Sequence, residues 1–145
     1  MIVFIDIDHT VSDAAWRDAM IGGEGGWDAY HLAAVRDKPI EPMANIVRAL
    51  HLASHTVVAS TARPEKWRQL TMAWLIQHDV PFDLLLMRGD KDFRPSPLIK
   101  LDHSKEGGQP DIVIDDRDDV CKAWAAKGAQ VVMMTFSTAT LREEV

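Results

Sequence analysis

Two acidic residues stand near the start of the chain, in the stretch IVFIDIDHT at residues 2–10. Four apolar residues lead into Asp6, one isoleucine separates it from Asp8, and Thr10 closes the stretch. Ionised carboxylates are costly to bury unless they are paired or bound to a metal. An ordinary buried strand has no use for two of them at its end, so the pair indicates a functional site.

Polar residues also follow the other apolar runs that we expect to be strands. They are Ser60, Thr61 and Arg63 in STAR, Arg88 after Met87, and Asp115, Asp116 and Arg117. Ligands of open parallel sheets bind outside the carboxyl ends of the strands. Three or four carboxylates meeting there would repel one another without a cation, and an all-oxygen ligand set favours Mg²⁺. The surrounding arginines, lysine and hydroxyl groups favour a phosphate as the remaining ligand.

The segments that must position these residues alternate between short apolar runs and longer stretches of helical periodicity. This alternation is typical of parallel strands joined by crossover helices. We therefore predict an α/β fold, a Rossmann-like three-layer α/β/α arrangement around a central parallel sheet of about five strands. The expected strands are 2–7, 56–61, 83–87, 111–115 and 130–135, and the expected helices are 42–53, 64–78 and 118–127, the last ending at Gly128.

Residues 11–41 interrupt the alternation, most visibly in GGEGGWDAY at 22–30. An insertion directly after the first strand predicts a small cap or loop over the site. The length of 145 residues fits a single domain spanning 1–145.

Composition excludes several classes of protein. The net charge of −6 argues against a surface that binds nucleic acid everywhere, although a local basic groove is compatible with it. The lone Cys121 provides neither a disulfide framework nor a zinc cluster, which favours a reducing compartment. Since no leader-like or membrane-spanning run occurs, we expect a cytoplasmic, soluble protein with no membrane contact and no obligate protein partner.

Four motifs together resemble those of the haloacid dehalogenase-like phosphohydrolases, in their order and spacing, over essentially the whole chain. They are DIDHT at 6–10, Thr61 after VVAS, Lys100, and IDDRDD at 114–119. Within that superfamily, residues 60–75, 85–100 and 113–124 are most similar to the 3′-phosphatase domain of phage polynucleotide kinase. The last segment is also similar to the 5′(3′)-deoxyribonucleotidases.

The resemblance implies a role for each motif residue. Asp6 would attack phosphorus and form an aspartyl phosphate, while Asp8 would protonate the leaving oxygen and later take a proton from water. Thr61 would donate to a phosphate oxygen, and Lys100 would screen the shared negative charge. Mg²⁺ would be held by the Asp6 side chain, the Asp8 backbone carbonyl and a carboxylate of Asp115 or Asp116. Further substrate contacts are expected from Thr10, Arg17, Arg63 and Arg88.

The substrate suggested first is the 3′-phosphate of a nucleic-acid end. Its backbone would follow a basic rim made of Arg63, Lys66, Arg68, Arg88 and Lys91. A nucleotidase acting on free mononucleotides is the alternative enzyme, with the insertion closing over the base and Trp27 or Tyr30 able to stack on it. A third possibility is a non-catalytic module that only binds phosphate.

Two departures from the family pattern and one missing motif bear on these expectations. Ser96 stands four residues before Lys100, where the phage phosphatase has an acid, and His9 replaces the usual glycine after the second aspartate. No GxxxxGK[ST] motif occurs, and GGEGG at 22–26 lacks the lysine and hydroxyl of a phosphate-binding loop. The sequence therefore predicts no kinase activity.

Overall fold

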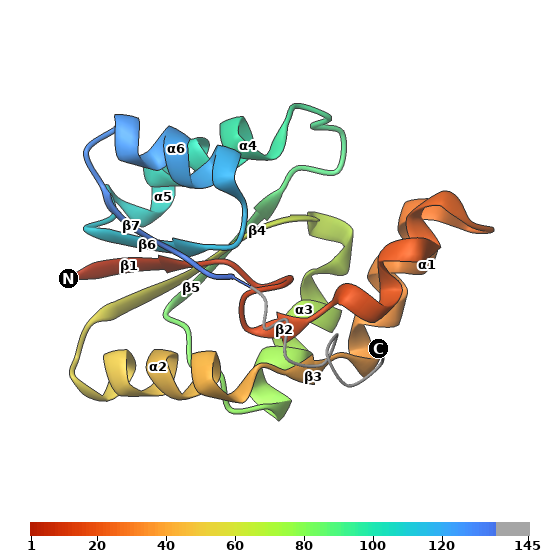
Figure 1. Ribbon diagram of the computed structural model, residues 1–145, viewed down its shortest axis with the longest axis horizontal. Helices are drawn as coiled ribbons and strands as arrows, with labels where there is room; N and C mark the ends of the chain where they lie inside the picture. The colour runs from red at the N-terminus through yellow and green to blue at the C-terminus, as the bar shows by residue number, and fades with distance from the viewer. Residues whose placement is uncertain (136–145) are drawn as a thin grey trace, which may run out of the picture.

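The computed structural model describes residues 1–135 and is built around one parallel sheet (Figure 1). Within those residues the sheet has five strands in the order β5-β4-β1-β6-β7. Each neighbouring pair is parallel, as the predicted crossover connections require. The strand bounds are β1 Ile2–Ile5, β4 Thr56–Pro64, β5 Leu84–Arg88, β6 Ile112–Asp115 and β7 Gln130–Met133. The predicted α/β Rossmann-like fold is confirmed.

Helices cover both faces of the sheet (Figure 1). One face carries α2 (Glu41–Leu52) and α3 (Arg68–Gln77), the latter preceded by the 3₁₀ helix η3 (Glu65–Trp67). The other carries α4 (Ser96–Asp102), α5 (Ser104–Gly107) and α6 (Asp118–Ala126). Parallel strands covered on both faces read as continuous apolar runs, which explains why the strands were recognisable in the sequence.

Side chains of β1 alternate between the two cores because successive residues of a strand point to opposite faces. Val3 and Ile5 join the core under α2 and α3, which contains Trp74. Phe4 joins the core under α6, where its ring meets Trp124 edge to face with 5.5 Å between ring centroids. The central strand is therefore anchored from both sides up to the residue before Asp6.

Several predicted boundaries were wrong. Strand β1 ends at Ile5 rather than at residue 7, and β4 continues beyond Thr61 to Pro64 with a register shift after Ser60. The predicted helix 64–78 begins as η3 and becomes α-helical only at Arg68. Helices α4 and α5 were not predicted, and Ile46, expected on the buried face of α2, is 47% exposed. Gly128 does follow α6 with φ +90°, as predicted.

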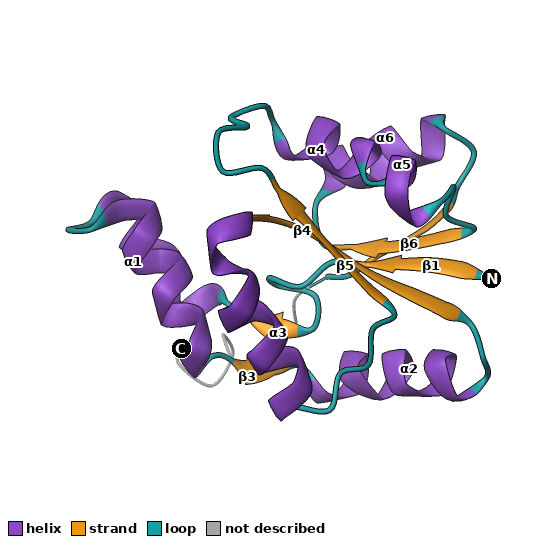
Figure 2. Cartoon of the chain, turned by 180° about the vertical axis from the view of Figure 1, so that it is seen from behind, coloured by secondary structure: helices purple, strands orange, loops and turns teal. Residues whose placement is uncertain are grey.

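The insertion at residues 11–41 contains more structure than its sequence suggests. Strands β2 (Ser12–Asp13) and β3 (Lys38–Pro39) pair antiparallel at its base. Between them lie η1 (Ala15–Gly22), α1 (Gly26–Ala33) and η2 (Ala34–Arg36). Helix α1 projects from the body beside α3 (Figure 2). We call residues 11–41 the cap, and the single-domain assignment of 1–145 stays a prediction.

No helix within residues 1–135 is long and apolar enough to cross a membrane.

Replacement of Gly107 by alanine tests the packing of α5 against the central strand. An added Cβ would lie 2.8 Å from Phe4 Cζ and 3.2 Å from Leu86 Cδ1. Because both side chains are buried, Gly107→Ala is expected to lower the free energy of unfolding by about 1–3 kcal/mol. Denaturant unfolding measures it, with Gly22→Ala as the control because nothing lies within 4 Å of that position. Equal stability of the two variants would contradict the packing.

Candidate active site

A buried lysine lies between two aspartates at the carboxyl end of the sheet. Asp6 follows β1, and Asp115 ends the adjacent parallel strand β6. Lys100, on α4, donates from Nζ to Asp6 Oδ1 at 2.7 Å and also to Asp115 Oδ2. All three side chains are buried. Burial disfavours the charged lysine, but the two carboxylates outweigh it and raise the pKa of Lys100 above its usual range.

The same end of the sheet carries more negative charge than Lys100 neutralises. Carboxylate oxygens of Asp6, Asp115 and Asp116 lie within 4.8 Å of one another. Burial raises the pKa of Asp6 to about 6, with Lys100 opposing and the charge of Asp116 adding to the rise. Burial also raises the pKa values of Asp115 and Asp116. An all-oxygen group with surplus negative charge fits a divalent cation such as Mg²⁺.

Asp8 lies in a different electrostatic environment, between two buried arginines. Arg63 donates from Nε to Asp8 Oδ2 at 3.1 Å and from Nη2 to Oδ1 at 2.6 Å, and Arg17 Nη2 also donates to Oδ1. Burial opposes ionisation, but Arg63 and Arg17 outweigh it and hold the pKa of Asp8 well below its usual range. At neutral pH, Asp8 is therefore ionised, and it is a weaker base than an ordinary aspartate.

Arg17 also connects Asp8 to the cap. Its Nε donates to Asp37 Oδ1 at 2.9 Å, its Nη2 to Asp37 Oδ2 at 2.7 Å, and its Nη1 to the Tyr30 carbonyl at 3.2 Å. Ser12 Oγ donates to Asp37 as well. Sequence reasoning missed Asp37, because a single acid between Arg36 and Lys38 looks like a surface residue.

The turn after β1 orients the first aspartate. Thr10, which is fully buried, donates from its hydroxyl to Asp6 Oδ2 at 3.1 Å. The Thr10 and Val11 amides both donate to the Ile7 carbonyl. The turn places His9 at φ +64°, a left-handed conformation that glycine adopts without strain. In this structure Thr10 contacts Asp6, while its predicted role in binding substrate stays a prediction.

A buried histidine links the lysine-bearing helix to two strands. His103 Nδ1 lies 2.7 Å from Ser60 Oγ, and its Nε2 lies 3.2 Å from the Met87 carbonyl. A carbonyl only accepts, so Nε2 carries the hydrogen and Nδ1 accepts from the Ser60 hydroxyl. Sequence reasoning missed His103, although it stands three residues after Lys100, where a helix would place it on a neighbouring position.

Thr61 is buried directly after Ser60 on β4. Its Oγ1 accepts the Arg63 amide at 3.1 Å, so its own hydroxyl hydrogen can be donated to another group. This arrangement is compatible with the predicted contact to a phosphate oxygen.

The remaining predicted arginine, Arg88, holds a loop. Its Nε donates to the Ala62 carbonyl at 3.0 Å, its Nη1 to the carbonyls of Asp92 and Arg94, and its Nη2 to Ser96 Oγ at 3.4 Å. These contacts fix the segment between β5 and α4. A direct role of Arg88 in substrate binding stays a prediction.

The proposed basic rim is only partly at the surface. Arg63 is buried, whereas Lys66 and Lys91 are exposed. Arg68 is engaged by Glu65, to which its Nη2 donates at 2.7 Å. Lys66 Nζ donates to Asp28 of the cap at 2.7 Å.

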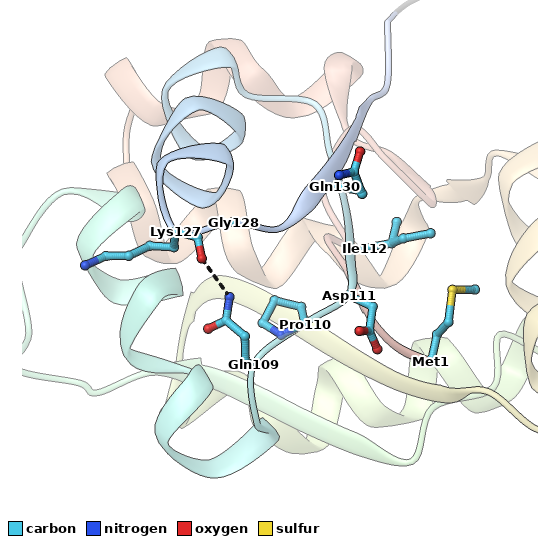
Figure 3. Close-up of a pocket in the computed structure, with 8 residues that line it drawn as sticks. All are labelled: Met1, Gln109, Pro110, Asp111, Ile112, Lys127, Gly128 and Gln130. Carbon is cyan, nitrogen blue, oxygen red and sulfur yellow. Dashed lines mark hydrogen bonds between the residues drawn. The ribbon is translucent and has the colours of Figure 1, made fainter.

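An open depression at the other end of the sheet contains none of these residues. It is lined by Met1, Asp111, Lys127 and Gln130, at the amino ends of the strands (Figure 3). Asp111 accepts the Ile2 amide there at 2.8 Å, which is a structural contact.

Comparison with known proteins identifies one family that covers nearly the whole chain. The family described as "Polynucleotide kinase PNKP phosphatase domain" matches residues 1–137. A search among curated proteins finds no match.

Solved structures agree with the fold. A chain of the "Pnkp1/Rnl/Hen1 complex" superposes with a TM-score of 0.75 at 24% identity, over 93% of this chain and 46% of that one. A haloacid dehalogenase-like hydrolase from Streptococcus pneumoniae gives a TM-score of 0.69 at 13% identity, over 92% and 84% of the two chains. A putative β-phosphoglucomutase from Thermotoga maritima gives 0.60 at 14% identity, over 98% and 90%. This chain therefore spans less than half of the Pnkp1-complex chain.

Substitution of His103 tests whether it is buried in its neutral form. Burial lowers the pKa of His103 to about 4, so as pH falls below 6.5 the unfolded chain takes up a proton first and stability is lost. The full effect between pH 6.5 and 4 is about 3 kcal/mol. In His103→Gln, unfolding free energies measured across this range should fall less steeply than in the unsubstituted protein. Parallel slopes would contradict a neutral buried His103.

Proposed function

Because the chain belongs to the polynucleotide kinase PNKP phosphatase domain family, we propose that it removes the 3′-phosphate from nucleic-acid ends with the help of Mg²⁺. The family makes it a phosphatase of the haloacid dehalogenase type. The observation that carries the finer proposal is the placement of Asp6, which is bonded by Lys100 and Thr10 and lies beside the carboxylates of Asp115 and Asp116.

The first step is an attack of Asp6 on phosphorus. A bond forms between a carboxylate oxygen and phosphorus while the bond from phosphorus to the 3′ oxygen breaks, which gives an aspartyl phosphate. Thr10 and Lys100 each bond one Asp6 oxygen and so fix the orientation of the carboxylate. The Lys100 charge also stabilises the negative charge shared by nucleophile and phosphate.

The second step is hydrolysis of the aspartyl phosphate. Asp8 takes a proton from water as the water attacks phosphorus, and Asp6 leaves as a carboxylate. The low pKa that Arg63 and Arg17 impose keeps Asp8 ionised, and Asp8 would become a stronger base once either arginine turned to the phosphate. Donation to the leaving oxygen in the first step requires a proton on Asp8. A substrate phosphate that draws hydrogen bonds from Arg63 would raise the pKa of Asp8 and permit this.

Mg²⁺ would be held by the Asp6 side chain, the Asp8 carbonyl, and Asp115 or Asp116. When bound, the ion neutralises charge on the phosphate oxygens. The raised pKa values of Asp6, Asp115 and Asp116 support a cation in this group, because they reflect burial and uncompensated negative charge.

Support for a polynucleotide substrate comes from the family and from exposed Lys66 and Lys91. A nucleotidase acting on free mononucleotides is the second candidate. The exposed Trp27 on the cap favours this candidate, because its ring can stack on the base of a free nucleotide. The two candidates share every catalytic residue and differ only in what lies beyond the phosphate.

Replacement of Asp6 by asparagine tests the nucleophile. Asp6→Asn should lower phosphate release from a 3′-phosphorylated oligonucleotide at least about a thousandfold, since the amide is a poor nucleophile. Asp6→Asn should still fold, because Lys100 keeps its hydrogen bond to Asp115 and the substitution removes one of the mutually repelling carboxylates. A malachite-green assay measures release beside a mixture of deoxynucleoside monophosphates. Unchanged turnover would exclude the nucleophile assignment, and preference for the monophosphates would favour the nucleotidase.

Thermal unfolding with and without Mg²⁺ tests the cation site. Mg²⁺ should raise the midpoint at pH 7.5 and raise it less at pH 5, because Asp6, with a pKa of about 6, must lose its proton to bind the ion. Asp116→Asn should reduce the shift at pH 7.5. Asp119→Asn is the matched control, since that aspartate is partly exposed and paired with Arg117. If Mg²⁺ raised the midpoint of Asp116→Asn and Asp119→Asn equally, Asp116 would not be part of the cation site.

A further inference from the structure

Trp27 on α1 is a large aromatic side chain that the fold does not bury. It is 59% exposed, although it lies in a helix whose neighbouring residues Tyr30 and His31 are buried. One face of its indole is stacked on His31, with 5.8 Å between centroids and 23° between planes. Tyr30 meets it edge to face at 5.5 Å. The indole is thus held in place by two rings while most of it remains open to solvent.

This exposed ring is connected to the catalytic residues through few contacts. The guanidinium of Arg17 lies 4.2 Å from the centroid of the Tyr30 ring, and the same guanidinium bonds Asp8. Two contacts, Trp27 to Tyr30 and Tyr30 to Arg17, therefore separate the indole from the group that holds Asp8. The part of the cap that carries Trp27 is therefore connected, through Arg17, to the aspartate two residues after Asp6.

Behind Trp27, the buried ring of His31 connects the cap to the body of the protein. His31 faces the ring of Trp67 on η3, with 6.2 Å between centroids. Lys66 Nζ lies 5.2 Å from the Trp67 ring centroid. Aromatic rings with an adjacent cation form the usual surface for single-stranded nucleic acid, since bases stack and phosphates pair with the cation.

The contact between α1 and η3 is incomplete within the described part of the chain. The ring nitrogens His31 Nδ1 and Trp67 Nε1 are buried there without a hydrogen-bond partner, and His31 as a residue is only 7% exposed. A buried polar atom without a partner costs about 1–3 kcal/mol. The ion pair that joins the two elements, Lys66 with Asp28, is exposed and contributes little. The contact between α1 and η3 is therefore only weakly held.

We propose that Trp27 binds the terminal nucleoside of the substrate, with the base stacked on the face of the indole that is turned away from His31. The inference rests on the proposed function and adds the part of the substrate that the cap recognises. It makes the base, rather than the phosphodiester backbone alone, a determinant of specificity.

The test compares kcat/KM for paired substrates with and without a base. The substrates are a 3′-phosphorylated oligothymidylate, the same strand ending in a tetrahydrofuran abasic residue, thymidine 3′-phosphate, and glycerol 2-phosphate. The unsubstituted protein should prefer the strand with the base. Trp27→Ala should lower kcat/KM about tenfold on both thymidine substrates and leave it unchanged on the other two, since stacking is all that is removed. Trp27→Phe should retain most of the preference.

Leu32→Ala is the matched control, because Leu32 lies on the same helix and is 57% exposed but has no aromatic face. It should behave like the unsubstituted protein on every substrate. The inference would be overturned if Trp27→Ala discriminated between substrates with and without a base as well as the unsubstituted protein does. Equal losses of kcat/KM in Trp27→Ala and Leu32→Ala, together with a change of oligomeric state, would also overturn it and would favour a protein contact at this helix. Thymidine 3′-phosphate keeps the Trp27 effect measurable even if the strand is not a substrate. Absence of hydrolysis with every ester would overturn the proposed function itself.

Discussion

The buried ion contacts of Lys100 are the constraint on which the rest of the site depends. A buried ammonium group is tolerated only when anions surround it, and here Asp6 and Asp115 provide them from adjacent parallel strands. The arrangement requires β1 and β6 to end at the same level and α4 to pack over them. Burial, together with the surplus negative charge of three carboxylates around one lysine, raises the pKa of Asp6 and favours the binding of a cation.

A second buried network makes the cap part of the site rather than an appendage. Arg17 is fully buried and divides its hydrogen bonds between Asp8 and Asp37. A guanidinium without these partners would be very costly in the interior. The position of the cap and the ionisation state of Asp8 therefore depend on the same side chain. A cap movement that separated Arg17 from Asp8 would raise the pKa of Asp8, while Arg63 on β4 would continue to hold it down.

The sequence predicted the features that have a local signature. Buried parallel strands are apolar runs, and acids at their ends, such as Asp6 and Asp115, stand out against them. Long-range partnerships have no such signature: Asp37 pairs with Arg17 across 20 residues, and His103 pairs with Ser60 across 43. Helix α4 was missed because the two prolines of RPSP at 94–97 are typical of a loop. Helix α1 was missed because glycines at 22–26 precede it.

Ser96 shows how the lysine is held when a familiar neighbour is absent. In the phage phosphatase that the sequence resembles, an acid stands four residues before the lysine, one helical turn away. Here Ser96 Oγ instead receives a bond from Arg88, and Lys100 depends on Asp6 and Asp115 alone among its described partners. The orientation of α4 is set by His103, which reaches β4 and β5. The position of the lysine thus depends on contacts between helix and sheet rather than on a contact within its helix. The sheet therefore fixes where Lys100, Asp6 and Asp115 meet.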